Sequence, residues 1–154
     1  MSRSTPMPLV PLPAAVLLLA LTGCAGMQMK PEVVATDNAP KAIGPYSQAI
    51  RTGPMLFLAG QIPIDPKSNQ LLVGTIEEET TLVLNNLKAV LEANGMTMAN
   101  VVSTSVFMKD LNDFPKMNTV YGTYFQKAPP ARATVQVARL PRDVKVEIEA
   151  IAIL

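Results

Sequence analysis

The stretch TIEEETTLVLNNLKAVLEANG, residues 75–95, decides the fold class, because it carries the strongest helical pattern in the chain. Its apolar residues recur at the spacing of an α-helix that is buried along one side. Thr75 and Glu78 form a capping box, in which each side chain accepts a hydrogen bond from the backbone N–H of the other residue. Asn94 and Gly95 supply a left-handed end. We therefore expect one long amphipathic helix here.

Strand patterns flank this helix on both sides. Before it, residues 41–50 are typical of a loop that leads into an edge strand, and residues 55–62 of a buried strand. The segment 65–69, DPKSN, predicts a turn between that strand and the helix. After the helix, residues 101–110 alternate between apolar and polar side chains, which again predicts a strand.

A second helix and two more strands complete the chain. Asp113 is placed to cap this helix and Pro115 to occupy its first turn. Two strand-like runs follow within residues 129–154. The order strand, strand, helix, strand, helix, strand, strand predicts an α+β fold. In this fold, two helices cover one face of a mixed sheet.

The last strand predicts an oligomer. It carries apolar residues on both of its sides, so a solvated second face of the sheet is not expected. Burial of that face against other copies of the chain would form a closed symmetric assembly. A tight hairpin across residues 140–143 would place Glu147 opposite Gln136 and roughly 13 Å from Arg132. Under this interpretation the two charges meet only across a subunit boundary.

Composition excludes several kinds of chemistry. The chain has 154 residues, which fits one domain with an appendage. Its net charge of +1 argues against a basic nucleic-acid-binding surface. The absence of histidine excludes Ser-His-Asp triads and His-bearing metal sites, and the single cysteine excludes an internal disulfide. Any catalysis must use carboxylates, Arg, Lys, Tyr, hydroxyls or backbone groups.

The N-terminus has the pattern of a secretory signal. Arg3 precedes the apolar segment AAVLLLAL, residues 14–21, which is shorter than the roughly 20 residues that span a bilayer. The segment ends in LTGC, which resembles a bacterial lipobox whose cysteine, Cys24, is lipidated and becomes the mature N-terminus. A plain cleaved signal or a free thiol is the alternative.

This interpretation defines the expected organisation of the chain. Residues 1–23 form a lipoprotein signal peptide, residues 24–36 a lipidated (palmitate-bearing) N-terminus and tether, and residues 37–154 the folded domain. We expect the protein to be exported and anchored by lipid to a bacterial membrane, on its periplasmic side. Ala25, directly after the cysteine, favours the outer membrane.

Two kinds of charged residue occupy unusual positions in the last strands. Arg132 begins a strand, where its guanidinium could bind a carboxylate or form an ordinary surface ion pair. Glu147 and Glu149 share a strand side with apolar residues, so one of them is expected to be paired, to have a raised pKa or to be functional. Alternation alone leaves both glutamates open.

Two uncharged residues are also candidates. Gly60 allows a ligand to approach the backbone, or marks a turn. Tyr46 lines a pocket or simply packs.

Five ordered motifs carry a resemblance to a known family: IGPYSQA, AGQIP, SVFMKDLNDF, PPARATVQVARLP and VEIEAIA. Over residues 37–154 the chain resembles the RidA family of reactive-intermediate (enamine/imine) deaminases. The resemblance implies a chorismate-mutase-like α+β fold and a homotrimer with sites at subunit interfaces. It also implies hydrolysis of 2-imino acids, such as 2-iminobutanoate and 2-iminopropanoate, to 2-oxo acids and ammonia, without a metal or an organic cofactor.

The resemblance also assigns roles to individual residues. It implies that Arg132 binds the substrate carboxylate and that Glu147, rather than Glu149, holds the attacking water. The implied substrate-binding residues are Tyr46, Gly60, Asn118 and Thr134. Two positions depart from the family pattern: Ala59 stands where serine is typical, and Thr134 where cysteine is typical. These departures bear on rate and substrate range.

Two other functions are compatible with the same motifs. A non-catalytic module, tethered to the membrane and binding small carboxylates or a protein, is favoured by Ala59 and Thr134. The ribonuclease or translation-inhibitor activity attributed to some family members is disfavoured by the lack of a basic patch and by the expected export.

Overall fold

The computed structural model describes residues 29–154 of the chain. The predicted signal peptide and the predicted lipidation of Cys24 lie outside these residues. Within the described range, no helix is long and apolar enough to cross a membrane.

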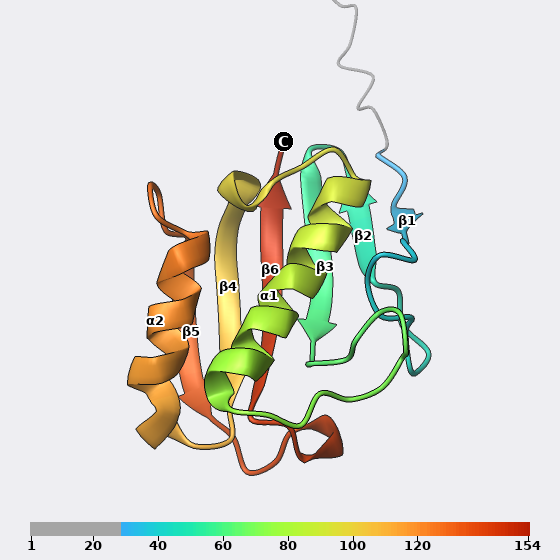
Figure 1. The fold of residues 1–154 in the computed structure, drawn as a ribbon. Coiled ribbons are helices and arrows are strands. Elements are labelled where there is room, and N and C mark those ends of the chain that lie inside the picture. Colours follow the sequence, from blue (N-terminus) through green and yellow to red (C-terminus); the bar gives the residue numbers. More distant parts are fainter. Residues whose placement is uncertain (1–28) are drawn as a thin grey trace, which may run out of the picture.

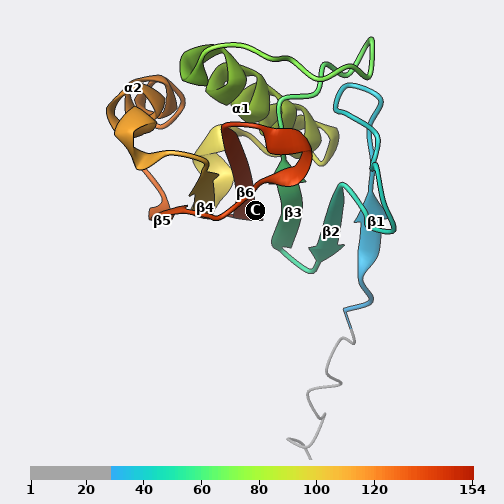
Figure 2. The ribbon, with the colours of Figure 1, turned by 90° about the horizontal axis from the view of Figure 1, so that it is seen from below.

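The described residues form a six-stranded mixed sheet with both long helices on one face (Figures 1 and 2). The sheet order is β1-β2-β3-β6-β4-β5, and only β4 and β5 are parallel. The α+β prediction is therefore confirmed. The elements in chain order are β1 (Glu32–Val34), β2 (Ala49–Thr52), β3 (Met55–Gln61), α1 (Ile76–Ala93), η1 (Met98–Asn100), β4 (Val101–Met108), η2 (Leu111–Asp113), α2 (Phe114–Tyr124), β5 (Ala131–Gln136), η3 (Pro141–Asp143) and β6 (Val146–Ile153).

Helix α1 begins and ends as its sequence predicts. The Glu78 N–H donates to the Thr75 hydroxyl at 3.2 Å, and the Thr75 N–H donates to the Glu78 carboxylate at 2.7 Å. Beyond its last residue, Gly95 has a φ of 71°, a left-handed conformation that glycine adopts without strain. Helix α2 differs in detail, because Asp113 occupies the N-cap position but its side chain makes no capping hydrogen bond.

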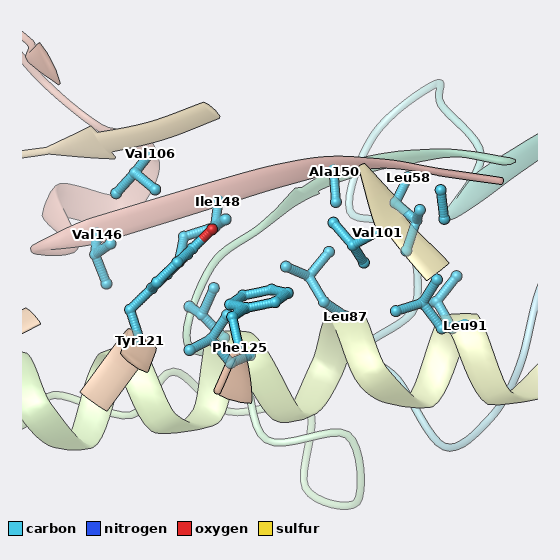
Figure 3. Close-up of a cluster of buried hydrophobic side chains, with 14 of the residues drawn as sticks. Leu58, Leu87, Leu91, Val101, Val106, Tyr121, Phe125, Val146, Ile148 and Ala150 are labelled. Carbon is cyan, nitrogen blue, oxygen red and sulfur yellow. The ribbon is translucent and has the colours of Figure 1, made fainter. Parts of the chain in front are cut away.

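The core lies between the two helices and the sheet (Figure 3). Tyr121 of α2 points toward Ile148 of the central strand β6, and Leu87 of α1 points toward the same strand. On β6, the residues facing the helices are buried and alternate with residues on the other face, which are more exposed. Apolar burial at about 25 cal/mol per Å² is the main stabilising term in such a layer. The helix layer thus buries only one face of the sheet.

The predicted hairpin between the last two strands is wrong. Strand β4 lies between β5 and β6, so Arg132 is paired with Thr104, and Glu147 is paired with Phe107 rather than opposite Gln136. The reason is the crossover through α2, which packs on the sheet and brings β5 alongside β4 in parallel. The connection back to β6 is consequently a longer loop that contains η3.

The N-terminal side of the sheet also differs from expectation. Residues 32–34, which the sequence pattern assigned to the tether, form β1 and pair with β2, so β2 is not an edge strand. The buried side chain of Gln48 fixes the following segment, because its amide donates to the Pro40 carbonyl at 2.7 Å and accepts from the Thr36 N–H at 2.6 Å. The folded domain therefore begins before residue 37.

Candidate functional site

Arg132 lies on β5, on the face of the sheet that the helices cover. Its Nη2 donates to the Asn118 Oδ1 of α2 at 2.9 Å. Its Cζ lies 4.5 Å from the centre of the Tyr121 ring and 5.6 Å from that of Phe114. Among residues 29–154, Arg132 forms no ion pair, so the surface salt bridge is not its role there. The guanidinium is instead held in a cradle that we define as Phe114, Asn118 and Tyr121.

Glu147 lies on β6, on the face of the sheet away from the helices. It is half-buried, whereas Glu149 on the same face is exposed. Burial raises the pKa of the Glu147 carboxyl above its ordinary value, and repulsion from Glu149 raises it further. A carboxyl with this property can exchange a proton near neutral pH more readily than an ordinary glutamate.

Gly60 gives Glu147 its place. A β-bulge on β3 between Leu58 and Gln61 brings the glycine beside the neighbouring strand. A Cβ at position 60 would lie 3.0 Å from the Glu147 Cδ and would overlap its Oε1. A side chain at position 60 would therefore displace the Glu147 carboxylate from the position it has in this structure.

Arg132 and Glu147 do not meet within one chain. Their side chains leave opposite faces of the sheet, because Arg132 contacts α2 and Glu147 shares its side with exposed Glu149. They are two strands and three residues apart in the register, which corresponds to roughly 14 Å. A hollow of about 680 Å³ between the loop before α1 and the first half of α1 is lined by neither residue. A single chain therefore does not bring Arg132 and Glu147 together in one site.

The remaining candidates lie on β5 and on the segments that contain β2 and β3. Tyr46 precedes β2 and is 48% exposed, with its hydroxyl accepting from the Ile43 N–H at 3.2 Å. Thr134 lies two residues beyond Arg132 on β5, and its hydroxyl oxygen is buried without a hydrogen-bond partner among the described residues. Ala59, next to Gly60, donates its N–H to the Gln48 carbonyl at 3.0 Å. Ala59 carries no hydroxyl next to the glycine that contacts Glu147.

Sequence reasoning missed the support of the arginine. Phe114, Asn118 and Tyr121 lie four and three residues apart, the spacing of one helix face. Of the three, only Asn118 was among the candidate residues from the sequence. The signal that could have revealed the cradle is an asparagine between two aromatics on a face that otherwise looks apolar.

The fold and the two charged groups define a class: a small α+β domain whose strands present an arginine and a carboxyl with a raised pKa. The chain belongs to the L-PSP endoribonuclease (RidA/RutC) family, whose model matches residues 36–154. It is 49% identical over 122 residues to the mouse 2-iminobutanoate/2-iminopropanoate deaminase, covering 79% of this chain and 90% of the relative. It is 57% identical over 121 residues to a RutC family protein of Pyrococcus horikoshii, covering 79% and 96%.

Solved structures show the same fold. A crystal structure of an endoribonuclease candidate from Thermotoga maritima superimposes with a TM-score of 0.79 at 55% identity, covering 82% of this chain and 98% of that one. The structure of E. coli TdcF with bound serine gives a TM-score of 0.77 at 43% identity, covering 80% and 98%. The family thus includes a protein named as an imine deaminase and a structure that holds a small amino acid.

Proposed function

We propose that this protein is a hydrolytic deaminase of reactive 2-imino and enamino acids, such as 2-iminobutanoate and 2-iminopropanoate. The observation that carries the proposal is the half-buried Glu147 carboxyl, with its raised pKa, beside a glycine that leaves room for it. The likeness to the mouse deaminase supports the same reaction.

The reaction suits a chain without histidine. An imine carbon is already electrophilic, so the protein needs to position water and move its protons, and no covalent nucleophile is required. Arg132 pairs with the substrate carboxylate through donors that Asn118 leaves free. Glu147 orients the water and accepts a proton from it as oxygen attacks the carbon. The carbon–nitrogen bond then breaks, oxygen remains in the 2-oxo acid, and both hydrogens of the water leave with the nitrogen as ammonia.

The proposal includes a homotrimer with sites at subunit boundaries. Its support is geometric, because Arg132 and Glu147 leave opposite faces of one sheet and a second copy is needed to bring such groups together. The open face also carries apolar side chains, including Phe57 and Ile153, each 40% exposed. Burial of these side chains would favour association.

We also propose that the mature protein is lipid-anchored at Cys24 and faces the periplasm, on the strength of the LTGC pattern. Mass spectrometry of the mature N-terminus tests this directly. Cys24→Ser is expected to move the protein from the membrane fraction to the soluble fraction. An unmodified Cys24 in membranes would contradict the proposal.

The activity is tested on soluble protein that begins at Ala25. An amino acid is oxidised in the cuvette, and the disappearance of its imine is compared with the spontaneous rate. Arg132→Ala is expected to abolish the acceleration while the oligomer persists. The matched control is Arg139→Ala, which removes an exposed arginine paired with Asp143 and should keep the rate. Equal rates for wild type and Arg132→Ala would refute the assignment.

A non-catalytic binding module is the second candidate. It is favoured by Ala59, which has no hydroxyl where the family typically has serine, and by the Thr134 hydroxyl, which has no hydrogen-bond partner among residues 29–154. The same assay separates the two functions. A module would bind a 2-oxo acid measurably and leave the spontaneous rate of imine hydrolysis unchanged.

A further inference from the structure

We infer that Tyr121 is a positioning residue for the Arg132 guanidinium, and that Thr104 fixes Tyr121 in this role. The inference rests on the proposed function, since it concerns how the carboxylate-binding arginine is aimed. Tyr121 does not touch the substrate in this proposal. It acts through the arginine that lies over its ring, 4.5 Å from Cζ to the ring centre.

The Tyr121 ring is held on several sides. It is 4% exposed, and its hydroxyl oxygen lies 2.7 Å from the hydroxyl oxygen of Thr104, which is 2% exposed. Phe125 also packs against it, with ring centres 4.6 Å apart. Burial raises the pKa of the Tyr121 phenol, so the hydroxyl remains protonated and available for the bond with Thr104. The ring is therefore a fixed surface.

Thr104 links this surface to the arginine through the sheet. In the parallel pairing of β4 and β5, Thr104 is the register partner of Arg132. The same pair of strands thus anchors the guanidinium through its backbone and, through Thr104, the ring beneath it. A shift of the Tyr121 hydroxyl relative to the Arg132 backbone would have to break the Thr104 bond or the strand pairing.

The cradle matters because arginine is a long side chain with many rotamers. A ring beneath a guanidinium attracts the cation and fixes its plane. Asn118 binds Nη2 from one edge. The remaining donors are left to face a carboxylate as a planar fork, the geometry in which arginine binds carboxylates best. Substrate binding then does not need to immobilise the arginine.

The test compares Tyr121→Leu, Tyr121→Phe and Thr104→Val, with KM, kcat and the dissociation constant of 2-oxobutanoate as readouts. Loss of the ring in Tyr121→Leu should weaken 2-oxobutanoate binding and raise KM by about tenfold. Most of the loss should fall on KM, because the carboxylate is gripped alike in substrate and transition state. Binding of 2-oxobutanamide, which lacks the carboxylate, should not change.

The variants that keep the ring give an independent check. Tyr121→Phe and Thr104→Val each remove the same hydrogen bond, so each should raise KM by about threefold and the double variant should add nothing further. This cycle decides the question if Tyr121→Leu does not fold. The matched control is Tyr124→Leu, which removes a tyrosine of the same helix that contacts α1 instead of Arg132. It should keep the affinity for 2-oxobutanoate.

Three outcomes are distinguishable. If Arg132→Ala leaves both the rate and 2-oxobutanoate binding intact, the proposed function fails, and this inference fails with it. If Arg132→Ala loses both but Tyr121→Leu binds 2-oxobutanoate like Tyr124→Leu, Tyr121 is only structural and this inference alone is overturned. Additive losses in Tyr121→Phe and Thr104→Val would also overturn it.

Discussion

In the folded chain, the surroundings of the Glu147 carboxyl oppose its ionisation. Burial, and then repulsion from Glu149, raises its pKa above the ordinary value of 4.5. Below the ordinary value both folded and unfolded chains carry the protonated group, and its contribution to stability is fully present. As the pH rises through the raised pKa of the folded state, that contribution is lost, because the folded chain must then bury a charge.

We therefore predict that Glu147→Gln is more stable than wild type at neutral pH and that the difference vanishes in acid. Urea unfolding from about pH 4 to about pH 8 measures this. Glu149→Gln is the companion variant, since removing its charge should move the Glu147 transition toward lower pH. A wild type that gains stability over Glu147→Gln as the pH rises would contradict the assigned direction.

At the scale of elements, Glu79 joins α1 to the start of β6. Glu79 is 2% exposed, and its carboxylate accepts from the Lys145 N–H at 2.8 Å and from the Lys145 Nζ at 3.2 Å. The same Nζ donates to the Gly74 carbonyl at 2.7 Å. This junction fixes the chain two residues before Glu147, so it also supports the candidate site.

Glu79→Ala is predicted to lower the free energy of unfolding by about 1–3 kcal/mol, because it leaves the Lys145 N–H without its acceptor. Glu79→Gln keeps an acceptor oxygen and should lose less. Glu77→Ala, in the same helical turn, is the control and should lose less than about 1 kcal/mol. Urea unfolding compares the three variants. Similar losses for Glu77→Ala and Glu79→Ala would show that the junction is not special.

Local patterns predicted most of the elements but not all of their pairings. The capping box at Thr75 and the alternation in β4 depend only on residues close together in the sequence, so α1 and β4 could be predicted. The packing of α2 decides which strand pairs with β5. The sequence of β5 itself does not show this choice, and the hairpin prediction failed for this reason. Strand β1 was not predicted, because it has only three residues and they are largely exposed.

The candidate site divides in the same way. Arg132 and Glu147 could be identified from the sequence, because a charged side chain in a strand that leads into buried surface is expected to form an ion pair or to have a function. Tyr121 did not, since an aromatic at helical spacing has the same pattern whether it supports a core or a guanidinium. Gly60 was a candidate from the sequence, but its close approach to Glu147 could not be predicted, because the two residues are far apart in the chain.

At the scale of the whole molecule, the face of the sheet away from the helices carries exposed apolar side chains that another copy of the chain could bury. Phe57 of β3 lies opposite Ile151 of β6 in the register, and Phe57 is 40% exposed although it lies in the interior of the sheet. The helices bury only the other face (Figure 2). In the proposed trimer, this apolar pair is covered by neighbouring copies.

Phe57→Asp is predicted to give a folded monomer, because the charge would have to be desolvated on assembly. Sedimentation measures the mass, and circular dichroism reports whether the fold is kept. The monomer should also lose deaminase activity, since Arg132 and Glu147 would no longer be brought together. Val73→Asp is the control, because Val73 is 79% exposed in the loop before α1 and its change should leave the assembly intact. A wild-type chain that sediments as a monomer at micromolar concentration would remove the basis for a shared site.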